Sequence, residues 1–476
     1  GEITKGSFEW ARRPPQCVFN DLRDLGSAGP DEMILQVNHP RDDLLGYFTQ
    51  YGRDPLTHDQ LPTDFLDRFT TPGGPAFIYP PIPEDPNDRS FQADQDCPWT
   101  EEEVGETAYS FDYDAIEILN GKLYWEVRHY RVPELLPPGN LPPPEMIPPT
   151  GSILIEEDGD VAFPGVVDDW FNLLNRGERT IGIGTGDSHS GFDEAGQFRT
   201  MIYTGVDDPI AITDQMVVDA LRSRRAVATN GPLIDFWVED PSAGAMGRTL
   251  ADVGGDGEVA LTYHLTSAPW ISVGRINIYR NGQIAYTTEI DPDRDLAADP
   301  FSETVLLALD EDETGAARDS WFVVEAIGYR SMHPVIRGLE LPPLLLTDAL
   351  ASLAGPLGLG GDEFGDLRPP ELFPVTGYAI TNPVWVTTDG GAFEAPGVVP
   401  VEVQNLPEND PQFQAGIFGV NQVSPREREA VLQSQLGRID VGGRRNVPLF
   451  YPLSEDITDV RKIMARLGHL GRHGPH

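Results

Sequence analysis

The sequence predicts an α/β domain followed by a β-sandwich, and three observations indicate this order. Short apolar strands alternate with amphipathic helices over residues 1–235. After Pro232 the pattern changes to short β-branched and aromatic segments separated by turn residues. From about residue 345 the chain is rich in Gly and Pro. We therefore expect an α/β domain at 1–235, an Ig-like β-sandwich at 236–345, and a loop-rich, partly helical region at 346–476.

The α/β prediction depends on three strands and two helices. Strands are expected at 33–37, 113–119 and 180–184, and the first two end at Asn38-His39-Pro40 and Asn120-Gly121. Residues 167–176 carry apolar side chains at helical spacing, and 213–224 has the same pattern with Thr213 as a plausible N-cap. Strands that alternate with helices favour a parallel sheet, open or barrel-shaped, with ligands where the strands end.

Proline-rich segments interrupt this domain at 72–98 and 133–149. Proline fixes φ and lacks a backbone N–H, so neither segment is expected to form a regular helix or an inner strand. We expect long loops there, either walling a substrate cleft or decorating the surface.

The β-sandwich is predicted from strands at 259–265, 275–279, 283–287 and 320–326. Asn281-Gly282 between two of them is a strong type I′ hairpin signal. Further helices are expected near the end of the chain, at 424–436 and 457–467.

Charge and composition exclude several classes of function. The 76 acidic and 34 basic residues give a net charge of −42, so nucleic acid and anionic membrane are poor partners. No apolar run is long enough for a transmembrane segment. Cys17 and Cys97 permit one disulfide, which suits an extracytoplasmic protein (periplasmic, cell-surface or secreted), although both cysteines could equally be unpaired.

Asp187 and His189 are the first candidates for chemistry. They stand two residues apart directly after the predicted strand at 180–184, so in extended backbone their side chains point to one side. A carboxylate with an imidazole is a proper ligand set for zinc, manganese or iron. Alone, such a pair is more often a hydrogen-bonded loop pair.

Three other residues join this pair. His39 also follows an apolar strand, although it could merely cap a carbonyl. Glu117 is an acid within an apolar strand, which is costly to bury unless it is paired or bound to metal; its alternative is an edge strand with a solvated face. Glu2 stands too near the start to be judged by pattern. Acids and imidazoles at the ends of several parallel strands indicate a metal site.

Taken in order along the chain, these motifs resemble one family. Asn38-His39-Pro40, the segment 115–121, the helix at 170–177 and Gly184-Thr185-Gly186-Asp187-Ser188-His189 follow the order of the PHP-domain metallohydrolases. The segments 198–200, 226–232 and 380–383 are similar to the carbaryl-hydrolase-like branch of that family. The resemblance spans most of residues 1–400.

The resemblance implies a PHP-type distorted (β/α)7 barrel with two or three divalent metal ions, zinc, manganese or iron, at the carboxyl ends of the strands. It implies Glu2, His39, Asp187 and His189 as metal ligands, and Glu117 with His189 as catalytic residues. Asn38, Ser188 and Arg199 lie in the same motifs and are expected to contact substrate. The family's opening His-x-His strand and Asp-His pair do not precede Glu2, so we expect the first strands to be supplied by an upstream segment or a second chain.

The leading functional hypothesis is a metal-dependent hydrolase that cleaves a small phosphoester or a carboxyl or carbamate ester with a metal-activated water. The alternative is a non-catalytic extracellular structural or binding protein that retains a PHP-like fold. A third hypothesis, a calcium-binding adhesion module, depends only on the acidic charge and on Asp389-Gly390-Gly391.

Overall fold

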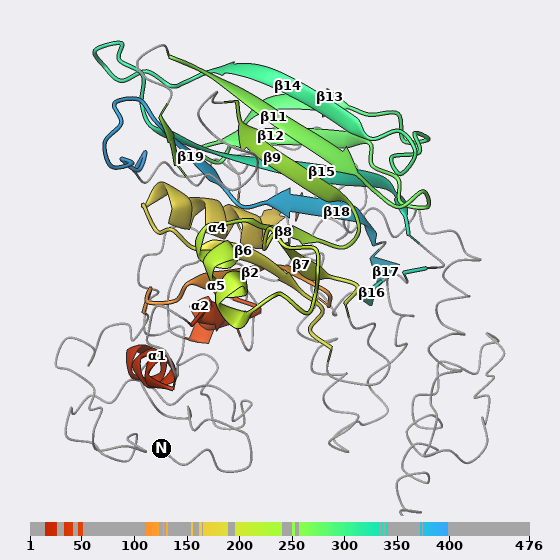
Figure 1. Ribbon diagram of the computed structural model, residues 1–476, viewed down its shortest axis with the longest axis horizontal. Helices are drawn as coiled ribbons and strands as arrows, with labels where there is room; N and C mark the ends of the chain where they lie inside the picture. The colour runs from red at the N-terminus through yellow and green to blue at the C-terminus, as the bar shows by residue number, and fades with distance from the viewer. Residues whose placement is uncertain are drawn as a thin grey trace, which may run out of the picture.

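A computed structural model of the chain arranges it as a mixed, sheet-rich α/β protein (Figure 1). The structure describes residues 15–25, 33–40, 46–50, 110–122, 127, 130–131, 154–155, 161–163, 165–188, 196–239, 250–252, 257–332, 335–336, 339–340, 372–373 and 375–397. The proline-rich segments and the helices expected near the end of the chain lie outside these residues. Within these ranges the strands form open sheets and no closed barrel. No helix among them is long and apolar enough to cross a membrane.

The expected parallel sheet is present. Strands β1 (Gln36–Val37), β2 (Ala115–Asn120) and β6 (Ile181–Thr185) are parallel and lie in the order β1-β2-β6. Every residue of β2 is buried. A strand covered on both faces has a continuous apolar run rather than an alternating pattern, which is why 113–119 was recognisable as a strand.

Helix α4 (Val166–Asn175) joins the parallel sheet to the β-sandwich, and all its residues are buried. On one side the indole Nε1 of Trp170 donates to the carbonyl of Thr180, at 3.0 Å, just before β6. On another side Phe171 packs on Tyr279 and Trp321 of the sandwich, with ring centroids 5.0 and 5.1 Å apart. Figure 1 shows α4 between the two layers, so one helix supplies core to both.

The remaining helices lie at the surface of the α/β part. Helix α5 (Asp214–Arg222) has the predicted N-cap, because the Thr213 hydroxyl accepts from the backbone N–H of Met216 at 3.3 Å. Helices α1 (Pro15–Asp24) and α2 (Tyr47–Gln50) precede β2 in sequence. Cys17 in α1 is disulfide-bonded, whereas the second cysteine, Cys97, lies outside the described residues.

The β-sandwich pairs an eight-stranded sheet with a three-stranded sheet. The larger sheet runs β10-β19-β15-β18-β8-β7, and β12 and β13 join it through β15. The smaller sheet has the order β14-β11-β9. Its members and those of the larger sheet are β7 (Arg199–Ile202), β8 (Ala226–Thr229), β9 (Leu233–Val238), β10 (Leu250–Asp252), β11 (Glu258–Thr266), β12 (Arg275–Arg280), β13 (Gln283–Glu289), β14 (Phe301–Ala308), β15 (Ser320–Ser331), β18 (Thr376–Thr381) and β19 (Val384–Thr387).

Short strands complete the described elements. A three-stranded sheet has the order β3-β5-β4, and β16 pairs with β17. Their bounds are β3 (Tyr130–Arg131), β4 (Leu154–Ile155), β5 (Val161–Phe163), β16 (Leu339–Glu340) and β17 (Leu372–Phe373). The predicted hairpin between β12 and β13 is confirmed: Asn281 and Gly282 have φ of 51° and 85°, the left-handed pair that a type I′ turn requires.

Sheet membership crosses both of the domain boundaries expected at 235 and 345. Strands β7 and β8 come from the first segment and β18 and β19 from the third, yet all four belong to the large sheet of the sandwich. The amide of Asn382, between β18 and β19, bonds the N–H and the carbonyl of Gly182 in β6, both at 2.8 Å, and the carbonyl of Ala226 at 3.0 Å. The buried apolar side chains form two large clusters and a third, small one of Ala115, Ile181 and Ile183.

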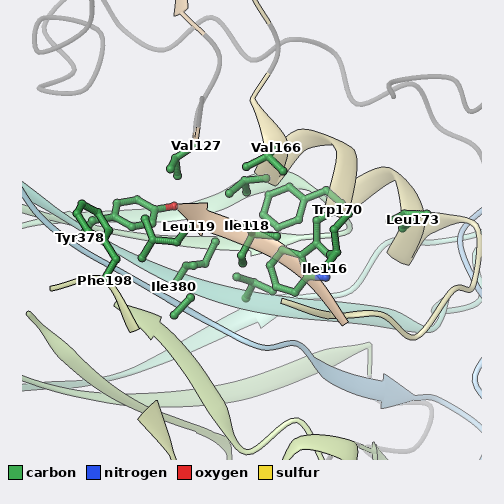
Figure 2. Packing of buried hydrophobic residues seen from close by; sticks show 14 of the residues in the cluster. Ile116, Ile118, Leu119, Val127, Val166, Trp170, Leu173, Phe198, Tyr378 and Ile380 are labelled. Atoms are coloured by element: carbon green, nitrogen blue, oxygen red, sulfur yellow. The ribbon is translucent and has the colours of Figure 1, made fainter. Parts of the chain in front are cut away.

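The first cluster packs β2 and α4 against the sandwich, and the second fills the space between the two sheets of the sandwich. Figure 2 shows the first cluster, in which side chains of β2 such as Ile116 and Leu119 lie among Trp170 of α4 and Tyr378 and Ile380 of β18. The α/β part is therefore built onto the sandwich rather than connected to it by a linker.

Candidate functional site

The carboxyl ends of β2 and β6 lie at one edge of the parallel sheet, because Asn120 pairs with Thr185. Gly121 after β2 and Gly186 after β6 therefore begin side by side. Strand β1 ends earlier, because Val37 pairs with Ile116, so His39 lies alongside β2 and its backbone N–H bonds Glu117. The structure thus places His39 next to Glu117, within β2, and Asp187 just beyond the end of β6.

Glu117 connects all three strands. Its side chain is 1% exposed. One carboxylate oxygen, Oε2, accepts from the backbone N–H of His39 and from the Asn120 amide at 3.0 Å, and the other, Oε1, accepts from the Thr185 hydroxyl. A buried carboxylate is costly unless donors surround it, and here each strand supplies one. The alternative of a solvated edge strand does not hold, because β2 is the central strand.

A local irregularity makes this arrangement possible. Residues three apart on a regular strand point to opposite faces, so Glu117 and Asn120 would not meet. The register of β2 against β6 shifts between Glu117 and Leu119, which is a β-bulge. The extra residue turns Asn120 toward Glu117. Bulges of this kind are frequent beside functional sites, where they redirect a side chain.

Two candidate ligands have unusual backbones. His39 and Asp187 have φ of 31° and 45°, in the left-handed region that side-chain-bearing residues rarely adopt. Among the described residues, the only other non-glycine residues with positive φ are Arg224 and Asn281. Such strained positions cluster at functional sites. Here both lie just beyond the ends of parallel strands.

The imidazole of His39 has one buried nitrogen, Nδ1, that makes no hydrogen bond to any residue in the described ranges. Such a nitrogen fits a metal ligand, because a coordinate bond would satisfy its lone pair. Asp187 is half-buried at the same edge and offers a carboxylate.

The backbone segments that follow β2 and β6 approach each other closely at this edge. The N–H of Gly121 donates to the carbonyl of Thr185 at 2.9 Å. A Cβ at position 121 would stand 2.6 Å from the carbonyl oxygen of Gly186, which is too short for any side chain. The Asn-Gly that ends β2 therefore lets this segment lie directly against the turn leading to Asp187.

The residues expected to contact substrate have different surroundings. Asn38 and Ser188 are exposed, and the Asn38 side-chain oxygen accepts from the Gln36 amide. The Arg199 guanidinium instead donates to the carbonyls of Gly196 and Gln197, at 3.1 and 3.3 Å, so these hydrogen bonds stay within its own loop.

The sequence did not single out Asn120, Thr185 or Thr200. Asn120 and Thr185 hold Glu117, and the Thr200 hydroxyl bonds both the N–H and the carbonyl of Gly184, each at 2.9 Å. Their shared signal is a polar side chain at the end or start of an apolar strand. That signal is weak, because the same residues are common in turns.

The ligand set is only partly within the described residues. Glu2 and His189 lie outside them. Among the side chains that are described, no group of three or more His, Cys, Asp or Glu is placed to hold a metal ion. No known family model matches the chain, and neither does any curated protein or solved structure.

Proposed function

We propose that the chain is a metal-dependent hydrolase of phosphoester or of carboxyl or carbamate ester bonds, with its centre at the carboxyl edge of β1, β2 and β6. The observation that carries the proposal is the pair His39 and Asp187, both held with positive φ beyond the ends of parallel strands. The buried Nδ1 of His39, which makes no hydrogen bond to any described residue, supports it further. We also propose that the parallel sheet is part of a PHP-type barrel, as the motif order indicates.

In this proposal Glu2, His39, Asp187 and His189 hold the metal ions. Imidazole and carboxylate ligands suit zinc, manganese and iron alike. When bound, such ions activate a water molecule and stabilise the negative charge that develops on the substrate. Asn38 and Ser188 are exposed at the same edge and are the residues available to orient a small ester.

Glu117 is a positioning residue in this mechanism rather than a group that touches substrate. Its oxygens already accept from the His39 backbone, Asn120 and Thr185. By holding the His39 backbone it fixes where the imidazole points, and by holding Thr185 it fixes the start of the turn to Asp187. Groups that orient ligands in this way tune metal affinity without binding the ion.

The test combines metal content with hydrolysis. The full chain, reconstituted with zinc or manganese, would be analysed for bound metal and assayed on bis(4-nitrophenyl) phosphate and 4-nitrophenyl acetate. We expect His39→Ala and Asp187→Asn each to lower metal content and to lower kcat/KM at least about 100-fold. His264→Ala is the matched control, because His264 lies in the sandwich, 3.7 Å from Asp235, and should change neither quantity.

Two results would count against the proposal: no bound transition metal after reconstitution, or unchanged metal content and hydrolysis in both site variants. The second candidate function, a non-catalytic binding protein with this fold, is favoured by the fully satisfied carboxylate of Glu117. It predicts metal that is lost in both variants, with no hydrolysis of either substrate by the unmodified chain.

A further inference from the structure

The strand that leads to Asp187 pairs with the backbone of one described strand only. Strand β6 pairs with β2, and the N–H of Ile181 donates to the carbonyl of Asp114 at 2.8 Å. Alternate residues of a parallel strand turn their N–H and C=O groups to opposite sides. Gly182 and Gly184 therefore direct these groups away from β2.

Two polar side chains of the sandwich take the place of a neighbouring strand at this side of β6. The amide of Asn382 bonds both the N–H and the carbonyl of Gly182, each at 2.8 Å. The hydroxyl of Thr200 in β7 does the same for Gly184, each at 2.9 Å. A hydroxyl both donates and accepts, so a single oxygen satisfies the two backbone groups of Gly184.

Strand β6 lies so close to β7 and β8 that only glycine fits at position 184. A Cβ there would stand 2.8 Å from the carbonyl oxygen of Arg199 and 3.3 Å from the Cβ of Ala228. The first distance is too short for any side chain, and the obstacle is backbone. Glycine in β6 therefore lets the half-buried hydroxyl of Thr200 reach the strand directly.

This contact lies just before the candidate metal ligand Asp187. Strand β6 ends at Thr185, whose hydroxyl bonds Glu117 on the side of β2. Thr200 and Glu117 therefore hold the last two residues of β6 from opposite sides. Asp187 has φ of 45°, and a residue with a side chain keeps such a backbone only where its surroundings determine it.

We propose that Thr200 is a positioning residue for Asp187 and that it acts through Gly184. The inference rests on the proposed function, in which Asp187 is a metal ligand. Because Thr200 belongs to the large sheet of the sandwich, the sandwich itself takes part in forming the metal centre. A ligand that is held in place before the ion arrives loses less freedom on binding, which raises the affinity for metal.

The test uses the full chain and three variants. Thr200→Val removes the hydroxyl and keeps the branched shape at Cβ, whereas Thr200→Ser keeps the hydroxyl. Thr304→Val is the matched control, because Thr304 is an exposed residue of β14 whose hydroxyl bonds that of Thr262 at 2.7 Å. Circular dichroism establishes that each variant is folded under the conditions used.

Two measurements are made on each folded variant. In zinc titration we expect Thr200→Val to bind about 10- to 100-fold more weakly, and Thr200→Ser to stay within about threefold of the unmodified chain. In hydrogen exchange with EDTA present, the amides of Gly186 and Asp187 should exchange at least about tenfold faster in Thr200→Val, with no change at residues 115–119. Thr304→Val should change neither quantity.

A role in general stability would give a different result. Exchange that rises equally at residues 115–119 would overturn the inference, and so would zinc affinity that is unchanged in Thr200→Val or lowered as much in Thr200→Ser. If the unmodified chain binds no zinc or manganese, the hydrolase proposal fails separately. Faster exchange confined to Gly186 and Asp187 would then still support Thr200 as the residue that holds this turn, and unchanged exchange there would refute it.

Discussion

Substitutions of Glu117 separate the charge of this carboxylate from its role as an acceptor. In Glu117→Leu, the backbone N–H of His39, the Asn120 amide and the Thr185 hydroxyl all lose their acceptor within a buried site. Hydrogen bonds to a charged group contribute about 1.5–3 kcal/mol each, and Thr185 is half-buried and can turn to solvent. The expected loss in the free energy of unfolding is therefore about 3–6 kcal/mol.

In Glu117→Gln one oxygen remains for His39 and Asn120, and the new NH₂ can face Thr185, whose hydroxyl can accept as well as donate. The expected cost is only about 1–2 kcal/mol, from losing the charge. Guanidinium denaturation followed by circular dichroism measures both variants. Zinc titration measures the affinity, which should fall about 10- to 100-fold in Glu117→Gln if Glu117 orients a ligand.

The control is Asp293→Asn, which removes a carboxylate that is 71% exposed and lies 2.6 Å from Arg330, itself 57% exposed. Its cost should be below about 1 kcal/mol, as for other exposed pairs. If Glu117→Gln were as damaging as Glu117→Leu, the charge rather than the set of donors would hold the edge together. If both cost less than about 1 kcal/mol, the three hydrogen bonds would not organise the site and the reasoning would be refuted.

Three further predictions concern the junction and the sandwich. Asn382→Ala should lower the free energy of unfolding by about 2–4 kcal/mol, because the N–H and the carbonyl of Gly182 lose their partner. Faster hydrogen exchange at residues 181–185 would report this loss, and unchanged protection there would contradict it. Phe171→Ala should lower the free energy of unfolding, measured by denaturant, by about 3–5 kcal/mol, since Phe171 is fully buried between Tyr279 and Trp321. A loss below about 1 kcal/mol would mean that α4 does not contribute to the core of both layers. Burial and then Glu303 raise the pKa of Tyr263, so the phenol stays neutral in the folded protein at a pH where it ionises in the unfolded chain. The free energy of unfolding should therefore fall as pH rises above about 10. Tyr263→Phe should reduce the slope of the free energy of unfolding against pH by about 1.4 kcal/mol per pH unit.

Local signals in the sequence were sufficient for the elements with one strong pattern. Thr213 was recognisable as a cap because its side chain needs only a neighbouring N–H, and Asn281-Gly282 as a turn because few residues accept φ above zero twice in succession. The strand that contains Glu117 was recognisable because it is apolar throughout. Its exact ends were not, since Asp114 and Asn120 suit both a strand and a turn.

Pairing between distant segments could not be read in the same way. Nothing local to residues 376–381 states that they lie beside β8, about 150 residues earlier, because the partner of a strand is decided by the whole fold. The candidate site shows the same division. His39, Glu117 and Asp187 were expected at one edge because parallel strands share their carboxyl ends, whereas the contact of Asn120 with Glu117 depends on a bulge that has no sequence signature.

The burial of α4 between two layers also has a consequence for how the chain matures during synthesis. Strand β18, which covers β8, is made about 150 residues later than β8. Asn382, which bonds Gly182, is made about 200 residues later than Gly182. At about 5–20 residues per second the ribosome needs roughly 10–40 s to deliver them. Through that interval β8 has no β18 beside it and Gly182 has no Asn382 amide to bond, so surface that the folded protein buries stays exposed on the nascent chain.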